Sequence, residues 1–199
     1  MKRSTRWFPV LLLAATALPR LASATSYVVD PQHTSVTFLV RHLFTNVEGR
    51  FRTFDGQIVF DPAAPEKTTV KGSIDVTSID TNVTKRDEHL RSPDFFDVAK
   101  FPKIEFTSTG VSDVDKTKNT GKIAGNLTIH GVTKPVVLDA QFLGAATDPW
   151  GNKKAGFSAS TVIDRKAFGL GWNKTLEAGG VLVGDEVTIR INAEGNVQE

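Results

Sequence analysis

Apolar and polar residues alternate along most of this chain, as they do in β-strands that bury one face. In residues 35–43, for example, Val36, Phe38, Val40 and His42 fall on one face of the predicted strand. The same pattern predicts strands over residues 49–60, 69–77, 103–109, 121–130, 136–142, 155–164 and 187–194. About eight strands joined by short turns predict an all-β fold, a closed antiparallel barrel.

The alternation stops at residues 85–102, in the middle of the chain. A run of four charged residues opens this stretch, and Thr84 with Asp87 three residues later resembles a helix-capping box. Pro93 disfavours helical backbone at the residue before it. The stretch therefore predicts one short helix over residues 84–91.

The first 24 residues have the features of a cleaved secretory signal peptide. Basic residues precede an apolar run over residues 8–18, and Ala22-Ser-Ala24 supplies the small residues that a signal peptidase needs. The run is shorter than the roughly 20 apolar residues that cross a bilayer. We therefore expect residues 1–24 to be removed on export and residues 25–199 to fold as a single domain.

Removal of the signal changes the charge of the chain. The full sequence has 24 basic and 22 acidic residues, but Lys2, Arg3, Arg6 and Arg20 lie in the predicted signal, which leaves a net charge of −2. Such a domain lacks the basic face that phosphate binding requires, so we expect no nucleic-acid partner. The absence of cysteine excludes disulfides, thiolate metal sites and a cysteine nucleophile.

Candidate catalytic and metal-binding residues are few. The four histidines are His33, His42, His89 and His130. None of them has another at the i, i+2 or i, i+4 spacing of a metal site, so we expect neither a metal nor a cofactor. For His42, a buried histidine satisfied by a neighbour is the simpler interpretation, and contact with a ligand is the alternative.

Two other segments invite a catalytic interpretation. Residues 156–160 begin like a nucleophile elbow, but they lack its closing glycine and fall within a predicted strand. Arg86, Asp87 and His89 are acid–base candidates, although a solvated helix face or an arginine–carboxylate tie is the simpler interpretation. We therefore expect no enzyme activity.

Aromatic side chains recur on the inward face of the predicted strands. An eight-stranded barrel is just wide enough to be filled by its own side chains, and the same width can hold one apolar ligand. The outcome depends on how many inward positions are small. The candidates for free space are Gly49, Gly56, Gly72, Gly125 and Ala140.

Many short motifs follow one another along the mature chain. They are residues 30–38 (DPQHTSVTF), 42–43 (HL), 47–51 (VEGRF), 54–58 (FDGQI), 86–90 (RDEHL), 94–97 (DFFD), 101–106 (FPKIEF), 125–133 (GNLTIHGVT), 164–165 (DR), 168–170 (FGL) and 184–187 (GDEV). Their order and spacing resemble the YceI family, the polyisoprenoid-binding, lipocalin-like proteins of bacterial periplasms. The Gly-x-Trp signature of true lipocalins is not found near the mature N-terminus, so the residue roles of those proteins do not carry over.

The resemblance implies an extended eight-stranded antiparallel, lipocalin-like barrel in a periplasmic protein. Its apolar channel would bind, carry or store a long-chain isoprenoid, quinone-like or otherwise, or another amphiphilic lipid. The side chains expected to line the channel are Val36, Phe38, Val40, His42, Phe54, Ile58, Phe60, Val76, Leu90, Phe95, Phe96, Phe106, Leu127, Ile129, Leu138, Phe142, Phe157, Phe168 and Trp172. Arg86, Asp87 and His89 are expected to tie the short helix to neighbouring loops.

The charged stretch then has a structural interpretation, as a lid in which Leu90, Phe95 and Phe96 turn inward over the channel. Two other functions stay open. A solid core would favour a structural or stress-response protein without an obligatory ligand, and an enzyme acting on an isoprenoid lipid is the less expected alternative. Transient membrane contact and a homodimer are also left open by the sequence.

Overall fold

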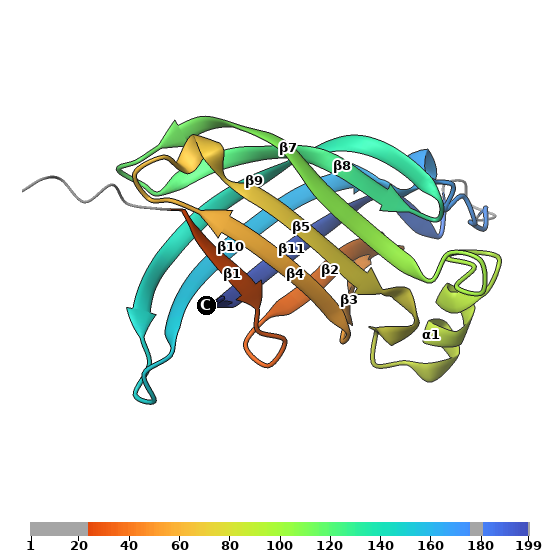
Figure 1. The fold of residues 1–199 in the computed structure, drawn as a ribbon. Helices are drawn as coiled ribbons and strands as arrows, with labels where there is room; N and C mark the ends of the chain where they lie inside the picture. Colours follow the sequence, from red (N-terminus) through yellow and green to blue (C-terminus); the bar gives the residue numbers. More distant parts are fainter. Residues whose placement is uncertain (1–23, 176–180, 199) are drawn as a thin grey trace, which may run out of the picture.

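The computed structural model describes residues 24–175 and 181–198. The predicted signal peptide, apart from Ala24, and residues 176–180 and 199 lie outside the described residues. Within them, the chain forms one curved sheet with a single α-helix, α1 (Thr84–Arg91), at one end (Figure 1). No helix in the described part is long and apolar enough to cross a membrane.

The sheet of the described residues contains eleven strands. They are β1 (Thr25–Val29), β2 (Ser35–His42), β3 (Thr45–Phe51), β4 (Phe54–Phe60), β5 (Thr69–Asp75), β6 (Ile79–Asp80), β7 (Lys103–Asp115), β8 (Thr120–Ile129), β9 (Val132–Thr147), β10 (Lys153–Asp164) and β11 (Val183–Val197). Strands β1-β4-β5-β7-β8-β9-β10-β11 close into a ring, because β1 pairs with both β4 and β11. Since these pairings are antiparallel, the predicted eight-stranded closed barrel is confirmed.

One edge of β11 is shared by two strands. Its C-terminal end pairs with β1, where Tyr27 lies opposite Val197, and its N-terminal part pairs with β2, where Val36 lies opposite Ile191. β2, β3 and β6 therefore continue the wall beyond the point where β1 ends. This extension carries the barrel toward α1 (Figure 1).

The sequence pattern misplaced two strand boundaries near the N-terminus. It missed β1, whose five residues include three adjacent apolar side chains and so show no alternation. The single strand predicted over residues 49–60 was wrong, because β3 and β4 are separate. The amides of Arg52 and Thr53 donate to the Ser78 hydroxyl, at 3.1 and 3.0 Å. These bonds to a side chain interrupt the strand-to-strand hydrogen bonding where the chain passes from β3 to β4.

The predicted hairpin of residues 121–130 and 136–142 is confirmed as β8 and β9, which pair over ten residues. β9 is longer than predicted and includes Pro135. Strand β10 pairs with β9 only from Asp139 onward, so Pro135 lies where β9 has one free edge. Proline is tolerated on such an edge, which explains why it does not end the strand.

The predicted helix is confirmed as α1, but the predicted capping box is wrong. The N-cap residue is Val83, and no side chain caps the helix. The Asp87 carboxylate instead accepts hydrogen bonds from the amide and the hydroxyl of Thr81, at 2.9 and 2.5 Å. It therefore ties the first turn of α1 to the segment that follows β6.

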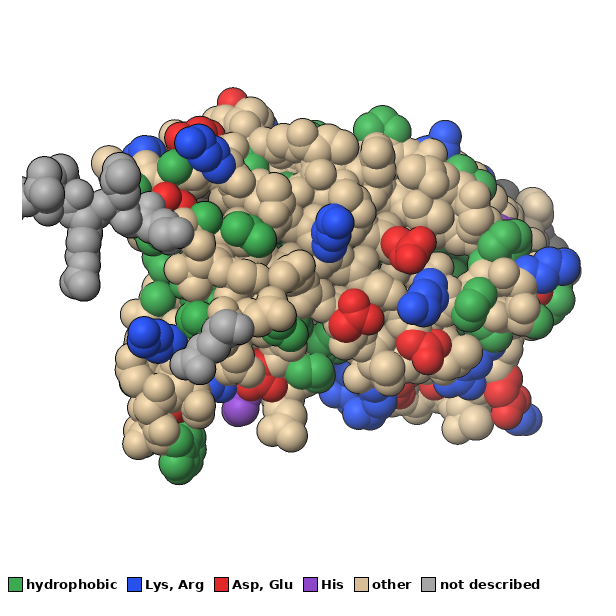
Figure 2. Space-filling model, in the orientation of Figure 1, with side chains coloured by type: hydrophobic (Ala, Val, Ile, Leu, Met, Phe, Trp, Pro, Cys, Tyr) green, Lys and Arg blue, Asp and Glu red, His purple; other side chains and the backbone are tan. Residues whose placement is uncertain are grey.

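The outer face of β4, β5 and β7 is mainly polar (Figure 2). Figure 2 shows that, over β4, β5 and β7, side chains of both charges are scattered and hydrophobic areas are small. The apolar residues of these strands face the interior, where Ile58, Phe60 and Ile104 are buried. The alternation read from the sequence thus separates a wet outer face from an apolar inner one.

Charged side chains hold the corner between β1 and β2 against β11. Asp30 Oδ2 lies 2.9 Å from His33 Nδ1 and 3.2 Å from Lys154 Nζ, and Lys154 also contacts Glu194 at 2.6 Å. Asp30, His33 and Glu194 have ligand atoms within 4.8 Å of one another, as a metal site would. The Lys154 ammonium already contacts both carboxylates, however, so the cluster is an ion-pair network. The hydrogen bond with His33, together with those from the Gln32 amide and Lys154, holds the pKa of Asp30 below its ordinary value.

Asp30→Asn should destabilise the domain in a pH-dependent way. A carboxyl whose folded pKa is depressed contributes stability above its unfolded pKa, about 3.9, and loses that contribution as pH falls through the folded pKa. We therefore expect the difference in unfolding free energy between wild type and Asp30→Asn to be largest near neutral pH and to shrink below about pH 4. Urea unfolding at a series of pH values measures it. Asp113→Asn removes an exposed pair with Lys122 and serves as the control; equal effects of the two substitutions would contradict the prediction.

Candidate functional site

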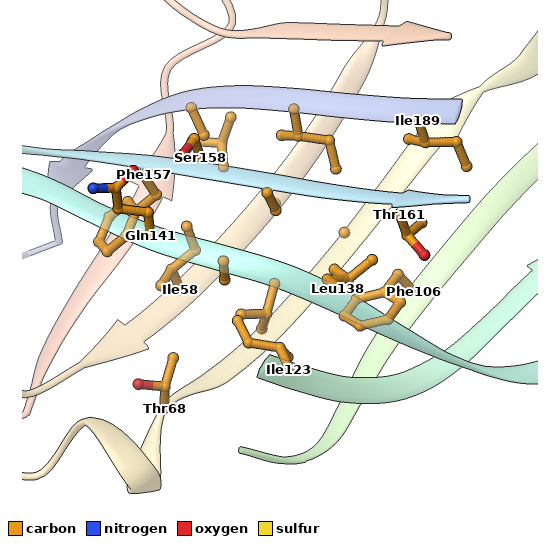
Figure 3. Close-up of a pocket in the computed structure, with 18 of the residues that line it drawn as sticks. Ile58, Thr68, Phe106, Ile123, Leu138, Gln141, Phe157, Ser158, Thr161 and Ile189 are labelled. Carbon is orange, nitrogen blue, oxygen red and sulfur yellow. The ribbon is translucent and has the colours of Figure 1, made fainter. Parts of the chain in front are cut away.

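The barrel is hollow and encloses a cavity of about 290 Å³. Inward side chains of all eight barrel strands line it. In Figure 3, Thr68, Gln141 and Ser158 lie toward one side of the view, whereas Phe106, Leu138 and Ile189 lie toward the other, together with the hydroxyl of Thr161. We call this space the barrel cavity. Its walls are mainly aliphatic and aromatic, which suits an apolar occupant.

A second cavity, of about 270 Å³, lies beneath α1 and the segment after it. Leu90, Phe95 and Phe96 come from the charged stretch, and Val40 and His42 come from β2. Trp172 closes another side, with its ring 5.1 Å from that of Phe95. We call this space the α1 cavity. The three residues predicted to turn inward therefore lie on its wall.

The two cavities adjoin inside the barrel. The residues that line both are Phe38, Phe51, Ile104, Ile129 and Ile189. The rings of Phe38 and Phe51 are 5.7 Å apart and tilted by 45°, so they form an aromatic part of this junction. The hollow interior thus extends from the turns opposite α1 to the space below the helix.

Two of the glycines expected to leave free space do not do so. A Cβ atom on Gly49 would lie 2.2 Å from the Phe38 ring, and one on Gly125 would lie 2.3 Å from the Phe106 ring. Each ring lies over its glycine, so the missing side chain is filled by an aromatic one. Gly72 differs, because a Cβ there would meet only the Asp55 carbonyl oxygen, at 3.6 Å.

The predicted channel residues fall into three groups. The barrel cavity is lined by Val36, Phe38, Phe54, Ile58, Phe60, Phe106, Leu127, Ile129, Leu138, Phe142 and Phe157. The α1 cavity is lined by Phe38, Val40, His42, Leu90, Phe95, Phe96, Ile129 and Trp172. Val76 and Phe168 lie instead in the packed core, 1% and 2% exposed, where they contribute to stability. His42 is half-buried on the cavity wall, which favours the ligand-contact interpretation of this residue.

Arg86 and Asp87 converge on one residue, Thr81. Arg86 donates from Nε to the Thr81 hydroxyl and from Nη2 to the Thr81 carbonyl, both at 2.7 Å. That hydroxyl donates in turn to Asp87, which is buried. His89 lies elsewhere, 2.8 Å from the Asp94 carboxylate and edge-on to Trp172. The three acid–base candidates therefore make contacts within α1 and its neighbouring segments and are not gathered around one reactive point.

A buried arginine that the strand pattern did not single out lies at the same end. Arg165 is 3% exposed and lines the α1 cavity. It donates to the carbonyls of Gly184, Leu170 and Trp172, and burial lowers its pKa, opposed by Asp185. These contacts hold the Trp172 loop against the start of β11. The only signal in the sequence was the pair at residues 164–165 among the family motifs.

The segment that begins like a nucleophile elbow lies inside β10, where Gly156–Ser160 pairs with both β9 and β11. A nucleophile elbow needs a sharp turn between a strand and a helix. Ser158 is therefore a wall residue of the barrel cavity.

Comparison with known proteins gives consistent matches over nearly the whole described chain. The YceI-like domain family model matches residues 27–195. A UPF0312 protein of Azotobacter vinelandii is 45% identical over 152 residues, 75% of this chain and 78% of that protein. Another from Vibrio cholerae is 42% identical over 162 residues, 80% of this chain and 85% of that protein.

Solved structures share the fold. BcnA of Burkholderia cenocepacia superimposes with a TM-score of 0.74 at 25% identity, covering 83% of this chain and 98% of that one. The Campylobacter jejuni YCEI protein gives 0.69 at 35% identity, covering 80% and 90%. A polyisoprenoid binding domain from Saccharophagus degradans gives 0.60 at 16% identity, covering 87% and 99%, which shows the fold alone. Together with the family model, these matches confirm the resemblance seen in the motifs: the chain belongs to the YceI-like family.

Proposed function

We propose that this protein binds a long-chain isoprenoid or another amphiphilic lipid inside the barrel and carries or stores it. The observation that carries the proposal is the adjoining pair of cavities, which gives the interior an elongated apolar space. The fold likeness to a domain described as polyisoprenoid binding supports the same ligand class. Fold alone does not fix function, so the proposal rests on the cavities.

The energetics favour such a ligand. Each methylene-sized unit transferred from water to an apolar site is worth about 0.8 kcal/mol. A long tail therefore has a large gross driving force, of which ordering and association costs cancel a substantial part. A tail recognised by length and shape remains releasable, as a carrier requires.

The proposal includes the periplasm as the place of action. Its support is the basic and apolar pattern of residues 1–24, with small residues at 22 and 24. A lipid tail has very low solubility in an aqueous compartment between membranes, so an enclosed binding site would shield it there.

A structural or stress-response protein without a ligand is the second candidate, and a solid core would have favoured it. The two cavities count against it, because protein interiors are normally packed with few voids larger than a water molecule. An enzyme ranks last, since Arg86 and Asp87 are engaged with Thr81.

Organic extraction of the purified protein followed by mass spectrometry should release a long-chain lipid. Gly72→Leu should abolish most of this yield, because its side chain would enter the barrel cavity without a close contact at Cβ. Gly110→Leu is the matched control at an exposed strand position, where a Cβ meets nothing within 4 Å. Wild-type protein that binds no added lipid and yields none on extraction would refute the proposed function.

The junction should set the tail length that the protein accepts. Gly49→Ala would push the Phe38 ring from its place, toward the space shared by the two cavities. We expect the affinity for geranylgeraniol to fall about ten-fold and that for the shorter geraniol to change less than about two-fold. Fluorescent-probe displacement measures both. Adding Phe38→Ala to Gly49→Ala should restore the long ligand; equal losses for the two alcohols would contradict this role.

The segment after α1 should act as a lid. Phe95 is buried against Trp172 and His89, and the Phe96 ring lies 6.3 Å from that of Phe51. Phe95→Ala with Phe96→Ala should lower the unfolding free energy by at least about 3 kcal/mol and speed the transfer of bound lipid to acceptor vesicles. Phe44→Ala, at an 86% exposed turn of the same end, is the control. If stability and transfer both stay at wild-type values, the lid interpretation is wrong.

A further inference from the structure

The two cavities differ in the charges on their walls. Among the described residues, the ionisable side chains that line the α1 cavity are Arg86, Arg165, His42 and His89, with no aspartate or glutamate. The barrel cavity has charged residues of both signs, namely Asp55, Asp115, Lys71 and Lys116. Within the described residues, the α1 end of the interior therefore offers positive charge and hydrogen-bond donors without a competing carboxylate on its wall.

Of the two arginines on this wall, Arg86 is the one with fewer donors used by the protein. Its Nε and Nη2 atoms donate to Thr81, which leaves Nη1 without an acceptor among the described residues. No carboxylate of the described part lies within ion-pair distance of its guanidinium. Every fully buried side-chain nitrogen or oxygen there has a partner, so Nη1 is at least partly accessible, and Arg86 lies on the wall of the α1 cavity.

Two of the other three basic groups on this wall, Arg165 and His89, are engaged by the fold. Arg165 donates to three backbone carbonyls and lies 3.5 Å from Asp185. His89 lies 2.8 Å from Asp94. A guanidinium with an unused edge is well suited to an oxyanion, because charge-assisted hydrogen bonds are short and strong.

We propose that the α1 cavity binds the head group of the amphiphile, and that this head group is an oxyanion, carboxylate or phosphate, held by the free edge of Arg86. The tail then passes the junction at Phe38 and Phe51 and fills the barrel cavity. This inference rests on the proposed function and adds the chemistry of the head and the direction in which the lipid lies.

Three probes with the same tail test it: geranylgeraniol, geranylgeranoic acid and geranylgeranyl phosphate, each measured by displacement of a fluorescent apolar probe. Wild type should bind at least one of the two anionic heads about ten-fold more tightly than the alcohol. The preferred anion separates a carboxylate ligand from a phosphate one. Arg86→Gln should reduce this preference, taken as the ratio of the anion and alcohol affinities of the same variant, to within about two-fold.

Matched variants locate the effect. Lys85→Gln, on the exposed neighbouring position of α1, should keep the preference, and Arg86→Lys should keep part of it because the charge remains. The head-group inference is overturned, while the proposed function stands, if wild type binds the three probes equally. It is also overturned if Lys116→Gln, in the barrel cavity, loses the preference and Arg86→Gln keeps it. If wild type binds none of the three probes, the proposed function itself fails for this ligand class. Arg86→Lys and wild type decide the question even where Arg86→Gln does not fold.

Discussion

An eight-stranded barrel is barely wide enough to enclose anything beyond its own side chains, and this limit governs the interior. The chain remains hollow because aromatic rings lie along the wall. Phe38 covers Gly49 and Phe106 covers Gly125, at positions where a Cβ atom would overlap the ring. A glycine in a strand often marks such a close approach. These glycines therefore help to keep the channel open, because each lets a bulky ring lie flat against the wall and away from the channel axis.

The wall extension toward α1 makes the two ends of the channel different. β2 takes over the edge of β11 where β1 stops, and β3 and β6 widen the sheet beside it. This longer wall leaves an opening that the charged stretch covers from one side and the Trp172 loop from another. Arg86 and Arg165 belong to these covering segments. On the described wall, this is therefore the end of the interior where positive side chains lie without a carboxylate beside them.

The sequence was most informative where local pattern and tertiary structure coincide. Alternation identified the inward faces of β2 and β4, and the charged run with Pro93 gave the bounds of α1. Local pattern could not show that Ser78 would capture the amides of Arg52 and Thr53 and divide one expected strand into two. Nor could it show that Asp87 would bind Thr81 and not cap the helix, since both outcomes satisfy the same carboxylate.

For the residues of the cavities, too, the sequence predicted side-chain direction within strands but not contacts made outside them. Alternation placed Phe38 and Leu138 on the channel wall, because side-chain direction in a strand is set by position alone. It also placed Val76 there, although the chain leaves the strand at that residue and turns it into the core. Arg165 was missed because its partners are backbone carbonyls of a loop and of β11, and the residue types in the sequence do not reveal such contacts.

Release requires one part of the barrel to open at a lower cost than the rest, and α1 has the features of that part. A helix of eight residues is marginal by itself, and Asp87 is its buried residue. Hydrogen bonds attach it to one segment: Arg86 donates to Thr81, Asp87 accepts from Thr81, and Arg91 donates to the carbonyls of Thr77 and Ile79. Each of these bonds involves a charged group, and because water can replace it on opening, its net contribution is about 1.5–3 kcal/mol. In the closed ring, each strand is hydrogen-bonded to a neighbour on both sides, so no strand can open alone. Local opening is therefore expected at the lid, which also contains Arg86.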